Sequence, residues 1–262
     1  MIAEARRRAP AAGRRDPARA AGAAPRTVWF LDLDDTLHDA SYAIGGQIDA
    51  RMTRFVARHL DLDEDEASRL RVAYWKRYGA TLLGLLRHHD VDPHRFLRET
   101  HDFDVGALLR AQRGLARRLA RLPGRKVLMT NAPRDYAMRV LQGIGLRRTV
   151  RDGYTIESLR AFGGFRPKPS TSMLRMVMAR EGLAGRARRS AAILVEDNLE
   201  NLRAARAVGL RTVLVQRAGV AAASVAARRR GPRRLAGGAY VDVRVHSAAH
   251  LLRIADRLAG RR

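Results

Sequence analysis

The chain has 262 residues, 46% of them hydrophobic, which is enough for one core with a smaller inserted domain. It has no cysteine, which excludes disulfides and thiolate chemistry, and no apolar run long enough to span a membrane, so we expect a cytoplasmic protein without a membrane partner. The formal net charge of +25 would suit nucleic acid, but much of it lies in the arginine-rich segments 1–26 and 217–234, so we do not expect a nucleic-acid partner.

The first half of the chain divides into a tail, a strand and a long helical segment. Residues 1–26 are a low-complexity basic tail that we expect to be disordered. Residues 27–33 form a short apolar run typical of a buried parallel strand. Residues 41–122 have helical periodicity without a strand, and breaks are expected near 61–65, 90–93 and 101–104.

Strands and helices alternate in the second half of the chain. The predicted strands are 126–130, 153–156, 191–195, 211–215 and 239–245, and the predicted helices are 133–143, 170–182, 198–208 and 247–258. This alternation predicts an α/β fold with a Rossmann-like parallel sheet core and an inserted all-helical cap domain. We expect the core to comprise 27–40 and 123–262, and the cap to comprise 41–122.

Two carboxylates, Asp32 and Asp34, follow the first predicted strand. A carboxylate held against a metal-neutralised phosphorus can attack it, and a second carboxylate can protonate the leaving oxygen and then activate water. An Asp-Xaa-Asp pair is, however, also typical of a strand that ends in an ordinary turn. The pair therefore acquires meaning only together with the other polar groups that follow the predicted strands.

Three further polar groups follow later strands or loops. Thr130 and Asn131 end one strand and open a helix, where a hydroxyl and backbone amides can cradle phosphate or merely cap the helix. Lys168 is one of only three lysines and lies between two prolines. Glu196 and Asp197 end the strand 191–195 and can complete the oxygen ligands of Mg²⁺. Parallel strands bring such groups to one edge of the sheet, which favours a common site.

This order of motifs resembles the haloacid-dehalogenase superfamily of hydrolases. Within it, the chain is similar to the pyrimidine 5′-nucleotidase branch in the segments Asp35-Thr36-Leu37-His38-Asp39-Ala40-Ser41, Tyr74-Trp75-Lys76-Arg77-Tyr78-Gly79, Gly84-Leu85 before His88, and Thr130-Asn131-Ala132-Pro133. The resemblance implies a Mg²⁺-dependent phosphate-monoester hydrolase, a 5′-nucleotidase that converts UMP or CMP to nucleoside and phosphate. The expected partner is a small phosphorylated metabolite, and the expected state is a monomer or dimer.

The resemblance also implies roles for single residues. Asp32 would be the nucleophile and a metal ligand, and Asp34 the general acid and base, with its carbonyl on the metal. Thr130 would bind the phosphate with help from the Asn131 amide. Lys168 would stabilise the phospho-aspartyl intermediate.

The last motif and the cap carry the remaining predicted roles. Asp197 would be the principal distal metal ligand and Glu196 a second candidate. His38, where the branch usually has tyrosine, and Tyr78 in the cap are the candidate substrate contacts. Two alternatives stay open: a phosphatase of the same superfamily for a sugar phosphate or phosphoglycolate, and a nucleic-acid-binding protein on a phosphatase scaffold.

Overall fold

The computed structural model describes residues 27–161, 163–185, 191–216 and 239–258. The predicted disordered tail, 1–26, and the arginine-rich segment 217–234 lie outside these residues. Within the described part of the chain, none of the helices is long and apolar enough to cross a bilayer.

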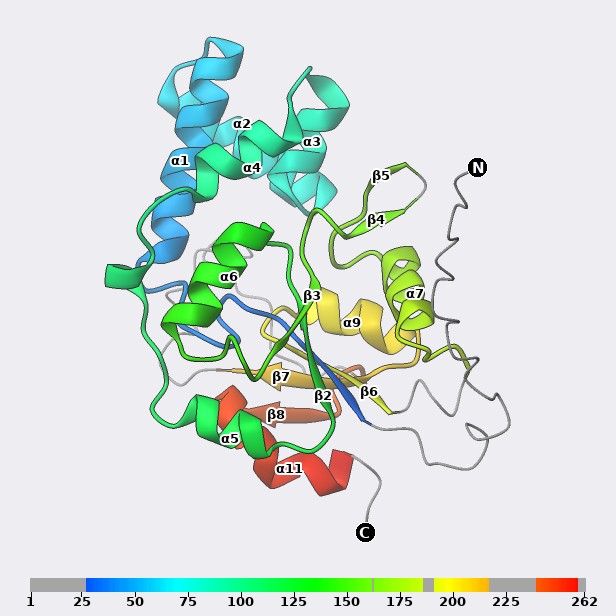
Figure 1. Ribbon diagram of the computed structural model, residues 1–262. Coiled ribbons are helices and arrows are strands. Elements are labelled where there is room, and N and C mark those ends of the chain that lie inside the picture. The colour runs from blue at the N-terminus through cyan, green and yellow to red at the C-terminus, as the bar shows by residue number, and fades with distance from the viewer. Residues whose placement is uncertain (1–26, 162, 186–190, 217–238, 259–262) are drawn as a thin grey trace, which may run out of the picture.

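The core is a six-stranded sheet in which all neighbouring strands are parallel, in the order β3-β2-β1-β6-β7-β8 (Figure 1). The strands are β1 (Val28–Leu31), β2 (Arg125–Met129), β3 (Arg151–Tyr154), β6 (Ala192–Glu196), β7 (Arg211–Val215) and β8 (Val243–Val245). The sheet grows from β1 to one side and then from β1 to the other, which is the order of a doubly wound Rossmann-like sheet. The predicted α/β fold is confirmed.

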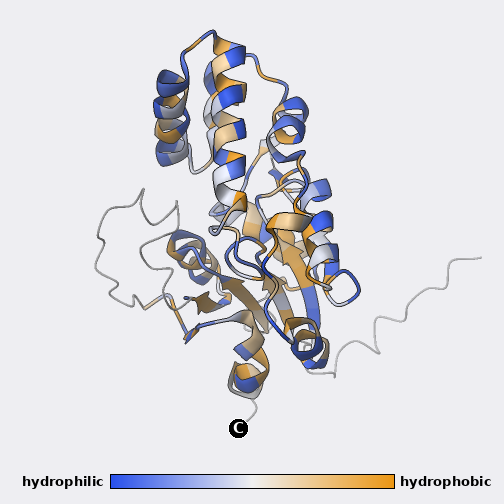
Figure 2. Ribbon diagram, turned by 90° about the vertical axis from the view of Figure 1, so that its left-hand side faces the viewer, coloured by the Kyte–Doolittle hydropathy of each residue, from blue (hydrophilic) through white to orange (hydrophobic). Residues whose placement is uncertain are grey.

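The central strand β1 is buried on both faces, which explains its uninterrupted apolar sequence. Successive side chains of a strand point to opposite faces. Trp29 and Leu31 accordingly join one hydrophobic cluster, and Val28 and Phe30 join the other. Figure 2 shows mostly hydrophobic strands in the core, beside helices that mix hydrophilic and hydrophobic residues.

Helices cover both faces of the sheet (Figure 1). The cluster of Trp29 and Leu31 includes apolar residues of α5 (Leu115–Arg121), α6 (Arg134–Gly143) and α11 (Leu251–Leu258). The cluster of Val28 and Phe30 includes those of α7 (Thr171–Arg180) and α9 (Leu199–Ala207). The short 3-10 helices η2 (Gly106–Leu108) and η3 (Ala248–His250) precede α5 and α11.

Four helices after β1 form a separate body with its own hydrophobic cluster (Figure 1). They are α1 (Ile44–Leu60), α2 (Glu64–Tyr78), α3 (Thr81–His88) and α4 (Pro93–His101). Asp63 caps α2 through a capping box with Glu66, and Asp92 caps α4, so the breaks predicted near 61–65 and 90–93 lie at helix starts, and the one near 101–104 lies at the end of α4. A further break was not predicted: Gly79, with a φ of 84°, ends α2 in the left-handed region.

The last part of the predicted helical segment packs on the sheet and not on α1–α4. Val105, Leu115 and Leu119 belong to the cluster of Trp29 and Leu31, and α5 contacts α11. We therefore propose that the inserted cap ends near Asp104, before the predicted limit.

A small antiparallel hairpin that was not predicted connects the sheet with the cap. It consists of β4 (Arg160–Ala161) and β5 (Gly164–Phe165), strands too short to leave a periodic pattern in the sequence. Phe165 is buried in the cap cluster together with Ile156. The hairpin therefore packs against the cap immediately before the chain reaches Lys168.

Candidate active site

The carboxyl ends of the central strands bring the predicted site residues together. Leu31 at the end of β1 is in register with Leu128 of β2 and with Val195 of β6. Asp32 continues this pairing, since its backbone N–H donates to the carbonyl of Val195 at 3.1 Å. The parallel register thus places Asp32 level with the ends of both neighbouring strands, where Thr130 follows β2.

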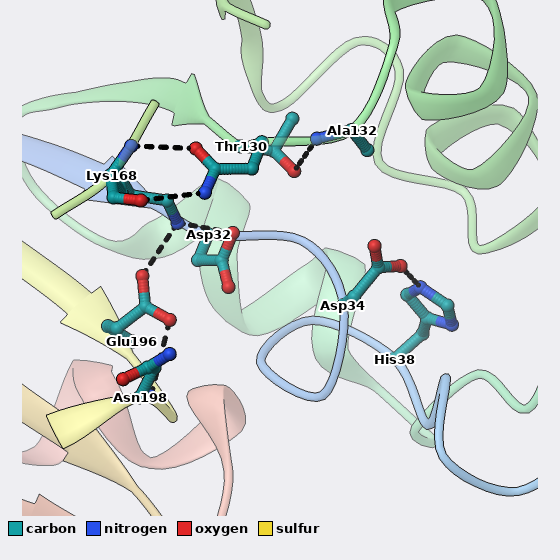
Figure 3. Close-up of polar contacts among 9 residues, drawn as sticks. Asp32, Asp34, His38, Thr130, Ala132, Lys168, Glu196 and Asn198 are labelled. Atoms are coloured by element: carbon teal, nitrogen blue, oxygen red, sulfur yellow. Dashed lines mark hydrogen bonds and ion pairs between the residues drawn. The ribbon is translucent and has the colours of Figure 1, made fainter. Parts of the chain in front are cut away.

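Lys168 forms a buried ion-paired group with Asp32 and Glu196 (Figure 3). Its Nζ lies 2.7 Å from Asp32 Oδ1 and 2.6 Å from Glu196 Oε2. Lys168 is 3% exposed and Glu196 1%. Burial alone would lower the pKa of Lys168, but the two carboxylates raise it above its ordinary value, so the ammonium stays charged.

The Asn131 side chain holds the backbone of Lys168 on both sides of its Cα. Asn131 Oδ1 accepts from the Lys168 N–H at 2.9 Å, and Asn131 Nδ2 donates to the Lys168 carbonyl at 3.0 Å. The backbone amide of Asn131 is predicted to assist phosphate binding. The side chain of the same residue has a different role, which is to hold the backbone of Lys168. The residue ties the end of β2 to the loop that carries the cation.

Asp32, Glu196 and Asp197 offer carboxylate oxygens that all lie within 4.8 Å of one another. Burial and then repulsion from Glu196 raise the pKa values of Asp32 and Asp197 well above the ordinary aspartate value. Such a cluster of hard oxygen donors fits a divalent cation such as Mg²⁺. Both oxygens of Glu196 already have a partner, since Oε2 contacts Lys168 Nζ at 2.6 Å and Oε1 accepts from the Asn198 N–H at 3.2 Å.

Thr130 lies at the same edge with its hydroxyl already oriented. Its Oγ1 accepts from the Ala132 N–H at 3.1 Å, and its own N–H donates to the Tyr154 carbonyl at 2.9 Å. The side chain is buried, at 2% exposed. Since the amide uses a lone pair of Oγ1, the hydroxyl proton can be donated to a ligand.

Asp34 lies beyond Asp32, on the His38 side of the site (Figure 3). Its Oδ1 accepts from His38 Nε2 at 2.8 Å and from the Tyr136 hydroxyl at 2.7 Å. Burial would raise the pKa of Asp34, but these two hydrogen bonds lower it below the ordinary value. His38 is fully buried in this contact, so it faces Asp34 and not an open surface.

Tyr78, the second candidate substrate contact, ends α2 in the cap. Its hydroxyl lies 2.5 Å from His88 Nε2. The next residue, Gly79, lies against Pro169: a Cβ built on it would be 3.8 Å from the proline Cδ. The cap therefore meets the Lys168 loop near Tyr78.

Two contacts at the site were not predicted from the sequence. Tyr136 bonds Asp34 from the first turns of α6, 102 residues further along the chain. The Asn131 side chain bonds Lys168 across 37 residues. The sequence signal was weak in both cases, since a tyrosine on an apolar helix face is typical of ordinary core packing.

Comparisons with known proteins show the family to which the chain belongs. A family model described as haloacid dehalogenase-like hydrolase matches residues 27–209. Phosphate metabolism protein 8 of Saccharomyces cerevisiae is 26% identical over 207 residues, which are 72% of this chain and 61% of that protein. The chain thus spans about three fifths of the length of this relative.

Solved structures share the fold at low sequence identity. The HAD phosphatase from Thermococcus onnurineus has a TM-score of 0.55 and 18% identity, covering 87% of this chain and 97% of that one. CbbY from Rhodobacter sphaeroides, in complex with phosphate, has a TM-score of 0.55 and 18% identity, covering 86% and 96%. L-2-haloacid dehalogenase from Xanthobacter autotrophicus has a TM-score of 0.54 and 17% identity, covering 87% of this chain and 98% of that one. By its match over residues 27–209, the chain belongs to the family of haloacid dehalogenase-like hydrolases.

Proposed function

We propose that the protein is a phosphate-monoester hydrolase that works through a phospho-aspartyl intermediate on Asp32. The observation that carries the proposal is the buried contact of Asp32 Oδ1 with Lys168 Nζ at 2.7 Å, beside the carboxylates of Glu196 and Asp197. A cation and a carboxylate held together at the edge of a parallel sheet suit the binding and attack of a phosphoryl group. Haloacid dehalogenase-like hydrolases form the family to which the chain belongs.

The first chemical step joins Asp32 to the phosphorus and breaks the bond from phosphorus to the ester oxygen. Asp34, protonated before this step, donates its proton to that oxygen, which leaves as an alcohol. In the second step Asp34 takes a proton from water and the water oxygen attacks the phosphorus. The bond from phosphorus to Asp32 breaks, phosphate is released, and Asp32 is again a free carboxylate. Lys168 and the Thr130 hydroxyl bind phosphoryl oxygens throughout.

Asp32 and Asp197 would hold Mg²⁺, with Glu196 as a second carboxylate candidate and the Asp34 carbonyl as a further ligand. When bound, the ion neutralises phosphoryl charge and so lets one anion approach another. Oxygen donors within 4.8 Å of one another and the raised pKa values of Asp32 and Asp197 support this assignment.

We propose a pyrimidine nucleoside 5′-monophosphate as the substrate. The sequence similarity of the segments around Asp35, Tyr74 and Thr130 to pyrimidine 5′-nucleotidases supports it. A cluster of rings in the cap also supports it, because Tyr78 lies beside Tyr74 and His88, with centroids 6.0 Å and 5.6 Å away, and aromatic side chains can stack on a base. A sugar phosphate or phosphoglycolate would use the same catalytic residues and is the alternative to exclude.

A phosphate-release screen tests both parts of the proposal. The substrates are UMP, CMP, AMP, common sugar phosphates and phosphoglycolate, each with and without Mg²⁺. We expect Mg²⁺-dependent release, highest for UMP or CMP, and its loss in Asp32→Asn. Asp61→Asn, an exposed position of the cap with a left-handed φ of 53° that asparagine tolerates, is the matched control.

Two results would contradict the proposal. No release from any monoester would remove the phosphatase assignment, and wild-type turnover by Asp32→Asn would remove the covalent mechanism. A preference for a non-nucleotide substrate would replace the nucleotide assignment alone.

A further inference from the structure

One oxygen of Asp34 receives two hydrogen bonds from different parts of the chain. Tyr136 OH donates from α6 at 2.7 Å, and His38 Nε2 donates from the loop after β1 at 2.8 Å. We propose that Tyr136 and His38 are positioning residues that fix the Asp34 carboxylate for proton transfer, so that Oδ2 faces the leaving oxygen. The proposal rests on the function proposed above for Asp34.

The geometry supports this division between the two oxygens. A carboxylate oxygen has two lone pairs, and both lone pairs of Oδ1 have a donor. The pair of donors opposes rotation of the carboxylate, because rotation would break both bonds. Oδ2 therefore keeps one orientation. General acid catalysis needs such a fixed oxygen within hydrogen-bonding reach of the ester oxygen.

Burial places the donors behind Asp34 and leaves Asp34 itself accessible. Tyr136 and His38 are fully buried, whereas the Asp34 side chain is 34% exposed. The Tyr136 ring is further held by the His101 ring, at 5.3 Å between centroids in an edge-to-face contact. Tyr136 and His38 are thus held firmly in the core, while the Asp34 carboxylate that they position is accessible to a ligand.

His38 carries a second indication that its place is set by Asp34. While Nε2 donates to Asp34, the other ring nitrogen, Nδ1, is buried and has no hydrogen-bond partner among the described residues. A buried ring nitrogen without a partner costs stability. A residue that served packing alone would avoid this cost, so we assign His38 to the orientation of Asp34.

Tyr136→Phe tests the proposal because it removes one donor and keeps the ring in the core. The measurement compares UMP, whose alkoxide needs a proton to leave, with p-nitrophenyl phosphate, whose phenolate leaves without one. With UMP we expect kcat to fall about 10-fold to 100-fold with KM within about twofold, a part of the effect of general acid catalysis. With p-nitrophenyl phosphate we expect the first-turnover burst at the wild-type rate and a slower steady state, since only the second step needs Asp34.

Control variants separate positioning from folding. Tyr154→Phe removes another buried tyrosine hydroxyl that donates to a carboxylate, Glu181 Oε1 at 3.0 Å, but outside the site, and should keep wild-type kinetics. His38→Gln retains an amide donor and should keep more UMP turnover than His38→Leu. This pair tests the proposal even if Tyr136→Phe is unstable.

The outcomes are distinguishable from failure of the proposed function. If the wild type releases no phosphate from any monoester of the phosphate-release screen, the proposed phosphatase function fails and this proposal with it. If the wild type is active, two results overturn the positioning roles alone: UMP turnover unchanged in Tyr136→Phe and His38→Leu, or an equal slowing of the nitrophenolate burst and of UMP turnover.

Discussion

Lys168 Nζ lies between Asp32 and Glu196, 2.7 Å from one carboxylate and 2.6 Å from the other, in a group almost closed to solvent. Without the ammonium, the buried carboxylates would repel one another. Removing one partner of a buried ion pair costs about 3–5 kcal/mol. The cation therefore stabilises the folded site before any substrate arrives.

Lys168→Met should accordingly lower both activity and the free energy of unfolding. We expect the rate of phosphate release to fall at least about 100-fold, as when a donor that stabilises transition-state charge is removed. We expect the free energy of unfolding to fall by about 3 kcal/mol. Phosphate release and urea denaturation measure the two effects. Lys126→Met is the control, because Lys126 Nζ donates to a backbone carbonyl outside the site, that of Leu122 at 2.8 Å. Equal losses in both variants would contradict the role of Lys168.

Mg²⁺ should stabilise the protein through Asp197. At a concentration 100 times the dissociation constant, a bound ion adds about 2.7 kcal/mol to the free energy of unfolding. Asp197→Asn should lose most of this increase. Without Mg²⁺ the variant should be at least as stable as the wild type, because burial and the neighbouring acids raise the pKa of Asp197 and so oppose its charge. Thermal melts with Mg²⁺ and with EDTA measure this, and an undiminished Mg²⁺ effect in Asp197→Asn would remove the assignment.

His101 should make the protein less stable at mildly acidic pH. Burial lowers the pKa of His101 from 6.5 to about 4. The unfolded chain therefore binds a proton below pH 6.5 that the folded protein does not bind until about pH 4. Stability is complete above pH 6.5 and falls by about 3 kcal/mol between these values, at 1.36 kcal/mol for each pKa unit.

Urea denaturation of His101→Asn from pH 7 to pH 4 measures this contribution. The variant should lose less stability on acidification than the wild type, by about 3 kcal/mol. His94→Asn, at an exposed position of the same helix, is the control and should follow the wild type. If the free energy of unfolding of His101→Asn fell with pH as steeply as that of the wild type, the contribution assigned to His101 would be contradicted.

Gly84 and Gly46 should respond oppositely to alanine. A Cβ on Gly84 would lie 2.2 Å from the Tyr74 ring, and such overpacking costs about 1–3 kcal/mol. A Cβ on Gly46 would meet nothing within 4 Å, and alanine in a helix is about 0.5–1 kcal/mol better than glycine. Urea denaturation of Gly84→Ala and Gly46→Ala measures the difference, and equal stability would show that α2 and α3 are packed less tightly.

The central strands could be predicted because they are buried on both faces and therefore leave continuous apolar runs, as β1 and β6 do. The break at Gly79 and the hairpin β4–β5 left no such signal. A single glycine in a polar helix is ambiguous, and two-residue strands have no period. The packing of α5 depends on contact with α11, from the far end of the chain, which a local pattern does not report.

The site residues could be proposed because parallel strands bring their ends to one edge. The roles of Asp32, Asp34, Thr130, Lys168 and Asp197 stay predictions. Their supports could not be foreseen. Tyr136 and the Asn131 side chain act across 102 and 37 residues, and each looks ordinary in its own segment.

The two bonds of Asn131 have a mechanical consequence. By pairing with both the N–H and the carbonyl of Lys168, one side chain acts like a short piece of neighbouring strand. The loop that carries the ammonium cannot slide along the end of β2 without breaking both bonds. One amide side chain therefore fixes the Lys168 backbone relative to the end of β2, where Thr130 follows, and the ion pairs with Asp32 and Glu196 fix the ammonium.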